Sequence, residues 1–182
     1  MRRLCSILFC ILLSTNLMVS LAQDAQLDAV DKLAIPLLVE FEGFSDEVYI
    51  CSGGKKTIGY GFTGAFGCGE IDLLDQPITE EHALSLLYCD LRVARDIVKK
   101  HVRVALTPNQ EAALTVWVFN LGEANLATST MLRKLNSHDF RGAAEALEWW
   151  NKARDPNTGS LLELKGLTRR RAAERALFER LS

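Results

Sequence analysis

Apolar side chains recur at steps of three and four residues over positions 27–41, and this is the period of an amphipathic helix. The stripe consists of Leu27, Val30, Leu33, Ala34, Leu37, Leu38 and Phe41. Pro36 lies inside the stripe, so the helix either kinks at this proline or begins there. Gly43 is placed to end the helix, which puts Glu42 at its carboxyl-terminal end.

The pattern changes between Tyr49 and Phe62, where aromatic residues, β-branched residues and glycines dominate. Ser52-Gly53-Gly54 is a turn signal between two short runs, so this stretch predicts a β-hairpin. A glycine-rich connection follows and carries Cys68. Its glycines are Gly64, Gly67 and Gly69.

From Thr79 onward every segment has the pattern of a helix. Thr79 is suited to cap the first of these helices, and Thr107 with Pro108 opens a second one that we expect to stop at Gly122. Further helix caps are expected at Ser129, Asp139 and Thr168. The sum is a small hairpin sheet packed beside a larger helical bundle, which is an α+β fold.

The first 22 residues differ from the rest of the chain. Two arginines precede a stretch without charge, residues 4–22, and Ser20-Leu21-Ala22 has the small residues of a cleavage site, so residues 1–22 are predicted to be a signal peptide. The alternative is a releasable membrane anchor, because 19 uncharged residues at a rise of about 1.5 Å nearly cross a hydrocarbon core of about 30 Å. Polar residues at 14–16 weaken that alternative. In either case, we expect residues 23–182 to be periplasmic or secreted.

Composition and charge narrow the class of protein. The chain has 182 residues, of which 48% are hydrophobic, and this fits one packed domain over residues 23–182. Because residues 1–22 hold two arginines and no acid, 19 basic and 23 acidic residues follow them, a net charge of −4. This balance argues against nucleic-acid binding as the main role. The three histidines have no ligand spacing, so we expect no metal and no cofactor, and we expect a monomer.

The cysteines indicate one disulfide and one remaining thiol. Cys5 and Cys10 belong to the first segment, which leaves Cys51, Cys68 and Cys89. An odd number in an oxidising compartment leaves one thiol over. Taken by itself, Cys51 is a candidate for half of a disulfide, with Cys68 as its partner.

Glu42 is the candidate catalytic carboxylate. Eight residues separate it from Cys51, and five more separate Cys51 from Thr57. This spacing puts a carboxyl, a thiol and a hydroxyl at a helix end and on two adjoining strands. A hairpin that folds back over the helix end would bring the three together.

These residues lie in the run FEGFSDEVYICSGGKKTIGYGFTG, which resembles the active-site segment of the phage-type lysozymes, the endolysins of glycoside hydrolase family 24. The pattern of that family is Glu, eight residues, Asp or Cys, five residues and Thr. Three later segments resemble helical segments of the family in the same order: LTPNQEAALTVWVFNLG, STMLRKLN and GLTRRRAAERALF. The resemblance extends from about Leu33 to Phe178 and implies a lysozyme-like fold.

The resemblance also implies a function, the hydrolysis of the β-1,4 bond between N-acetylmuramic acid and N-acetylglucosamine in peptidoglycan. Glu42 would be the general acid, which requires a carboxyl kept protonated near neutral pH by a partly desolvated site. Cys51 occupies the position of the second carboxylate, as in a minority of the family, and a thiolate there can attack the anomeric carbon or orient water. Thr57 would hold water or substrate.

Further roles follow from the same resemblance. Tyr60, Asn120 and Arg170 are the expected substrate-binding residues. One arginine of the run 169–171 is expected to reach Glu42 or the acidic glycan, and the alternative is a solvated basic face. The alignment of Cys51 with a catalytic position implies that the disulfide joins Cys68 to Cys89.

Two alternatives to a hydrolase stay open. A lytic transglycosylase needs only the acid and leaves a 1,6-anhydro sugar, whereas a lysozyme-fold wall-binding protein would have lost catalysis because Cys51 is oxidised or structural. The acidic balance of the chain is unusual for a protein that binds acidic peptidoglycan. Residues 151–182 nevertheless carry eight basic and four acidic groups, which allows a local positive face.

Overall fold

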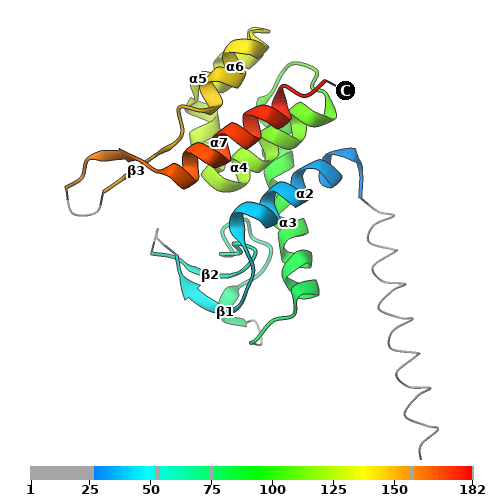
Figure 1. Ribbon diagram of the computed structural model, residues 1–182. Helices are drawn as coiled ribbons and strands as arrows, with labels where there is room; N and C mark the ends of the chain where they lie inside the picture. The colour runs from blue at the N-terminus through cyan, green and yellow to red at the C-terminus, as the bar shows by residue number, and fades with distance from the viewer. Residues whose placement is uncertain (1–26, 52–53, 74–75, 156–157, 182) are drawn as a thin grey trace, which may run out of the picture.

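The computed structural model describes residues 27–51, 54–73, 76–155 and 158–181 (Figure 1). The predicted signal peptide or anchor, residues 1–22, lies outside the described residues. Among those that are described, no helix has the length and apolar character needed to cross a membrane. The fold is α+β, as predicted, with helices packed together and two small antiparallel sheets.

Helix α2 spans Ala29–Glu42 and carries Glu42 as its last residue. A reciprocal capping box fixes its start, because Asp28 accepts hydrogen bonds from the second and third backbone N–H groups and Asp31 bonds back. The helix therefore does not begin at Pro36, which lies inside it, and that alternative is wrong. Gly43 ends the helix with φ 67°, a left-handed value that suits glycine, as predicted.

The predicted hairpin is present and starts earlier than the sequence indicated. Strand β1 spans Ser45–Ile50 and pairs antiparallel with β2, Lys56–Gly59, with Tyr49 opposite Thr57. The turn residues 52 and 53 lie outside the described residues. At Gly59 a Cβ would come within 2.9 Å of Ala83 Cβ, so glycine allows the strand to pack against the next helix.

The helices after residue 79 begin at the predicted caps, with one exception. The 3₁₀ helix η1, Ile71–Leu73, precedes α3, Glu80–His101, and α3 leads to α4, Pro108–Thr128. Then follow α5, Thr130–Asn136, and α6, Phe140–Leu147. Thr79, Thr107, Ser129 and Asp139 each accept a hydrogen bond from a first-turn N–H of their helix. Helix α4 breaks its helical geometry at Gly122, with φ 79°, where the sequence predicted its end.

Two expectations about the last segment are wrong. Strands β3, Lys152–Arg154, and β4, Leu161–Glu163, form a second antiparallel hairpin where only helices were predicted. Helix α7 then spans Lys165–Phe178, so Thr168 is not its cap. The cap position belongs to Leu164, and Thr168 Oγ1 lies one turn inside, where it donates to the Leu164 carbonyl over 3.2 Å.

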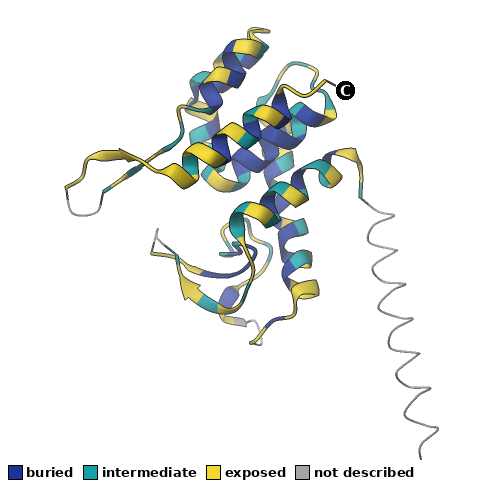
Figure 2. Ribbon diagram, in the orientation of Figure 1, coloured by how far each residue is buried: buried dark blue, intermediate teal, exposed yellow. Residues whose placement is uncertain are grey.

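The buried residues form one core that joins two parts of the molecule, the β1–β2 hairpin with its loop and the group of helices α4 to α7. Figure 2 shows the buried faces of α3, α4 and α7 turned inward and a mostly buried β2, while β1, β3 and β4 are mostly exposed. Trp117 on α4 is fully buried and meets the Trp150 ring edge-on, at 5.3 Å between centroids. Helix α3 runs from the β1–β2 hairpin to the helices α4 to α7 (Figure 1), and it contacts both β2 and α4.

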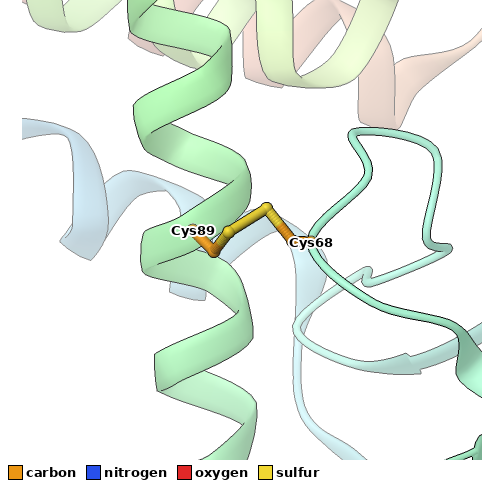
Figure 3. Close-up of a disulfide and its surroundings, with 2 residues drawn as sticks. All are labelled: Cys68 and Cys89. Atoms are coloured by element: carbon orange, nitrogen blue, oxygen red, sulfur yellow. A yellow bond between two sulfur atoms is a disulfide. The ribbon is translucent and has the colours of Figure 1, made fainter.

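A disulfide joins the glycine-rich loop to α3. Cys68 and Cys89 form this bond, with a Cα–Cα distance of 5.9 Å (Figure 3). It is the pairing that the family resemblance implied, and the alternative pairing of Cys51 with Cys68 is wrong. The bond holds the loop against the helix residue that precedes Asp90.

Candidate active site

A cleft of about 670 Å³ lies between the β1–β2 hairpin with its glycine-rich loop and the helices α3 and α4. Four of the predicted site residues line it: Glu42, Cys51, Thr57 and Asn120. They come from the end of α2, the end of β1, β2 and α4, so the fold brings together residues that are far apart in the sequence.

Glu42 projects from the last position of α2, and its side chain is 18% exposed. Its Oε1 accepts a hydrogen bond from Arg170 Nη1 at 2.7 Å. Its Oε2 lies against Gly61, where φ is 81° and a Cβ would come within 2.8 Å of that oxygen. Glycine is therefore required at this point for two reasons, the left-handed backbone and the close approach of the carboxylate.

Arg170, the partner of Glu42, belongs to a buried cluster of charged residues on α7 that also contains Arg171 and Glu174. Glu174 Oε1 accepts from Arg170 Nε at 3.3 Å and from Arg171 Nη2 at 2.8 Å, and Arg171 Nη2 also bonds Asn120 Oδ1 at 3.0 Å. Arg171 and Glu174 are fully buried. Burial raises the pKa of Glu174 to about 7 and lowers the pKa of Arg171 to about 10. The cluster links Glu42 to Asn120 through a chain of hydrogen bonds.

The structure distinguishes the three consecutive arginines. Arg170 is the one that reaches Glu42, whereas Arg169 bonds Glu40 at the surface over 2.6 Å. Arg170 does not itself line the cleft, and it acts on the cleft through Glu42. The sequence reasoning missed Glu174, although an acid four residues after Arg170 on a helix is the spacing of an ion pair.

Cys51 and Thr57 face the cleft from the hairpin. Cys51 directly follows β1, is half-buried, and lies outside the disulfide. Its backbone N–H donates to the Lys55 carbonyl at 3.0 Å, which joins the residue after β1 to the residue before β2. Thr57 is buried on β2, and its Oγ1 donates to the same carbonyl at 3.1 Å. The Thr57 oxygen can also accept a hydrogen bond.

The hydroxyl of Tyr49 has a raised pKa. Burial raises the pKa of its hydroxyl, and the negative charges of Glu42 and Cys51 raise it further. Tyr49, Glu42 and Cys51 all line the cleft.

Tyr60 does not lie in the cleft, which does not fit its expected contact with substrate. Its side chain is buried and its hydroxyl donates to Glu80 Oε1 at 2.5 Å. Burial and this bond raise the pKa of Tyr60 to about 12. Its ring packs against Phe44 with centroids 5.5 Å apart, so Tyr60 ties the hairpin to the start of α3.

Asp90 lines the cleft and was not predicted. It is 2% exposed, and its Oδ1 has no hydrogen-bond partner among the residues that the structure describes. Burial raises its pKa to about 6. The available signal was an acid on the apolar face of α3, between Leu87 and Ala94.

The chemical groups of the cleft define what it can do. A carboxyl, a thiol and a hydroxyl can supply proton transfer, nucleophilic attack and hydrogen bonding. Over the described ranges, no group of three or more His, Cys, Asp or Glu residues is arranged to hold a metal ion.

Comparison with solved structures places this architecture in the lysozyme-like class. The muramidase domain of SpmX from Asticaccaulis excentricus superposes with a TM-score of 0.71 and 33% identity, over 81% of this chain and 95% of that chain. The phage lysozyme family model matches residues 39–174. The chain belongs to the phage lysozyme family.

Two phage endolysins are similar to this chain over most of their own length. An endolysin from Acyrthosiphon pisum secondary endosymbiont phage 1 is 35% identical, over 82% of this chain and 97% of its own length. An endolysin from Salmonella phage P22 is 39% identical, over 75% of this chain and 88% of its own length.

Proposed function

We propose that this chain is a muramidase that hydrolyses the β-1,4 bond between N-acetylmuramic acid and N-acetylglucosamine, with Glu42, Cys51 and Thr57 as its reacting and positioning groups. Its family makes it a peptidoglycan-degrading glycoside hydrolase. The observation that carries the residue assignment is the cleft itself, which these three side chains line together.

Glu42 acts as the general acid. Its Oε1 is held by Arg170, and its Oε2 lies beside Gly61, which also lines the cleft. The protonated carboxyl gives its proton to the glycosidic oxygen as the bond to the anomeric carbon breaks. A water then adds its hydroxyl to the anomeric carbon, and the remaining proton returns to Glu42. The products are two chains, one of which has a new reducing end.

Cys51 supplies the second group of the reaction. Its thiolate either attacks the anomeric carbon and forms a glycosyl–enzyme bond that water later breaks, or orients the attacking water directly. Thr57 positions this water through its hydroxyl oxygen. Both residues belong to the hairpin, so they approach the glycan from the side opposite α3 and α4.

The products of peptidoglycan digestion test the reaction class. Hydrolysis predicts new reducing ends without 1,6-anhydromuramic acid, because water attacks the anomeric carbon. A lytic transglycosylase would instead yield the anhydro sugar, since the 6-hydroxyl of the same sugar attacks. Mass spectrometry of soluble fragments from purified peptidoglycan separates the two outcomes. Binding to peptidoglycan with neither product would indicate the wall-binding alternative.

Substitution and trapping at Cys51 test its two roles. Cys51→Asp introduces the carboxylate found in most of the family, which can act as base or as nucleophile, so a variant that keeps activity supports a chemical role for this position without separating the two. Cys51→Ala removes both roles and is expected to lose activity in either case. A glycosyl adduct on Cys51 in the wild type, detected by mass spectrometry after rapid quenching, identifies a nucleophile. Full activity of Cys51→Ala would contradict both roles.

We also propose that residues 23–182 act outside the cytoplasm, on the cell wall. The proposal rests on the uncharged stretch 4–22 and its small-residue cleavage site. We expect the exported protein to begin at Gln23 when its amino terminus is sequenced. A retained Met1 in the membrane fraction would instead support the anchor.

A further inference from the structure

We propose that Asp90 is a further substrate-binding residue, whose carboxylate accepts a hydrogen bond from a hydroxyl or amide N–H of the glycan in the cleft. This inference rests on the proposed function, because it takes the glycan as the ligand. It assigns a role to a residue of α3 that the reaction described above does not use.

The first observation is an unsatisfied buried carboxyl. Asp90 is 2% exposed and lines the cleft, yet its Oδ1 meets no hydrogen-bond donor within the described part of the chain. Buried polar groups in proteins are almost always hydrogen-bonded, and a buried group that lacks a partner costs stability. A donor that arrives with a ligand explains why such a carboxyl is placed at the wall of a cleft.

The second observation is the apolar character of the surrounding wall. Val93 and Ile97 lie on the same helix and line the cleft, and Phe66 and Phe119 face it with ring centroids 5.9 Å apart. Binding sites for small molecules combine such apolar walls with a few polar groups that fix orientation. A sugar ring matches this arrangement, because it presents C–H groups to apolar side chains and directs its hydroxyl and amide donors to an acceptor.

The position of the carboxyl is held firmly. Asp90 follows Cys89, whose disulfide fixes the loop that carries Phe66 to α3. The loop and the helix therefore present Phe66 and Asp90 to the cleft as one unit. The raised pKa of Asp90, about 6, agrees with a carboxyl that is charged at neutral pH but poorly stabilised because it is buried.

The inference predicts opposite effects on stability and on binding. Asp90→Leu replaces the carboxyl by an apolar side chain of related shape, which suits a buried helix face. The melting temperature should rise, because the unsatisfied group is gone. Glycan binding should weaken by about 10- to 100-fold, the range for a lost hydrogen bond to a charged group. Asp90→Asn keeps a neutral acceptor and should lie between Leu and the wild type.

The experiment uses the full chain with Glu42→Gln, so that the glycan is bound without being cleaved. Binding of a soluble tetrasaccharide of alternating N-acetylglucosamine and N-acetylmuramic acid is measured by calorimetry, and melting is followed by circular dichroism. Asp96→Leu and Asp96→Asn are the matched controls, because Asp96 is exposed on the same helix and does not line the cleft. The controls should change neither quantity as the Asp90 variants do.

Each outcome decides the inference. Weaker binding with an unchanged or higher melting temperature supports it, whereas unchanged binding overturns it. A lower melting temperature with unchanged binding identifies Asp90 as structural. If the wild type releases no reducing ends but Asp90→Leu still weakens binding, only the hydrolase proposal fails. If the Glu42→Gln protein binds no tetrasaccharide, this inference fails.

Discussion

Glu42 reaches its place in the cleft because the residue opposite its carboxylate has no side chain. A Cβ at Gly61 would come within 2.8 Å of Glu42 Oε2. The carboxylate would have to turn aside, and its bond to Arg170 Nη1 would be lost or lengthened. The orientation of the acid therefore depends on a glycine of the hairpin as much as on an arginine of α7.

This dependence predicts that Gly61→Ala lowers kcat by about tenfold or more, since misplacing a catalytic group by an ångström is costly. Gly67→Ala is the matched control, because Gly67 also has a positive φ but a Cβ there meets no described atom within 4 Å. Both variants should lose about 1 kcal/mol of stability through backbone strain. Equal activity of the two variants would contradict this role of Gly61.

The pKa of Asp90 makes the stability of the protein depend on pH. Burial raises this pKa from 3.8 to about 6, so the folded state holds the proton more tightly than the unfolded state. Its contribution to stability is therefore favourable at low pH and is lost as pH rises through about 6. At neutral pH the ionised carboxyl of Asp90 lowers the free energy of unfolding by about 3 kcal/mol relative to low pH.

Thermal melting of Asp90→Asn and the wild type tests this sign. The variant cannot titrate at position 90, so it should be the more stable protein at pH 7 by several degrees. The difference should shrink toward zero as pH falls to about 4. Glu174 also has a raised pKa, but it is present in both proteins and cancels in the comparison. A difference that stays constant from pH 4 to 7 would contradict the assignment.

At the scale of elements, α7 supplies the electrostatic support of the site. Arg170 and Arg171 occupy its second turn, and Glu174 lies one turn later with both guanidinium groups bonded to it. A buried pair of cations is stable only when a carboxylate compensates their charge. Glu174 thus fixes Arg170, and Arg170 fixes Glu42.

Removing that carboxylate should destabilise the fold and slow the reaction. At about pH 8, above the pKa of Glu174, we expect Glu174→Gln to cost about 3 to 5 kcal/mol, because it leaves two buried cations with less compensation. The loss in kcat should exceed any change in KM, since Glu174 acts through the acid and does not line the cleft. Glu179→Gln is the control: Glu179 bonds Arg175 at the exposed end of α7, where such a pair contributes about 0 to 1 kcal/mol. Similar unfolding midpoints for both variants would contradict the role of Glu174.

The sequence predicted those elements whose signals are local. Caps such as Thr79 and Ser129 and the end of α2 at Gly43 depend on neighbouring residues only, so they could be found without a structure. Strands β3 and β4 were missed because three residues each are too few to show a period of two. The run between them, Asp155 to Gly159, has the composition of a turn, but a turn by itself does not distinguish a hairpin from a connection between helices.

The residues of the candidate site also fall into those with a local sequence signal and those without one. Glu42, Cys51 and Thr57 lie within one short segment with a recognisable spacing, so they could be predicted from the sequence. Asp90 and Glu174 owe their importance to burial, which tertiary packing determines. The position of Tyr60 was misjudged for the same reason, because its side chain turns to Glu80 on α3.

At the scale of the whole molecule, the cleft lies between the β1–β2 hairpin with its loop and the group of helices. The β1–β2 hairpin and the disulfide-bonded loop form one wall, α3 and α4 form the other, and α3 runs through both parts (Figure 1). The proposed acid, Glu42, comes from α2, its partner Arg170 from α7 and the Cys51 thiol from the hairpin. The proposed reaction therefore requires several segments of the domain, and no single segment holds the site.

The central claim is that Glu42 is the acid of a peptidoglycan hydrolase. Its most direct test is the release of reducing ends from purified peptidoglycan by the wild type, Glu42→Gln and Glu40→Gln. Glu40 is the matched control, because it lies on the same helix and bonds Arg169 at the surface. We predict a loss of about 10²- to 10⁴-fold for Glu42→Gln and little change for Glu40→Gln. Near wild-type release by Glu42→Gln would contradict the claim.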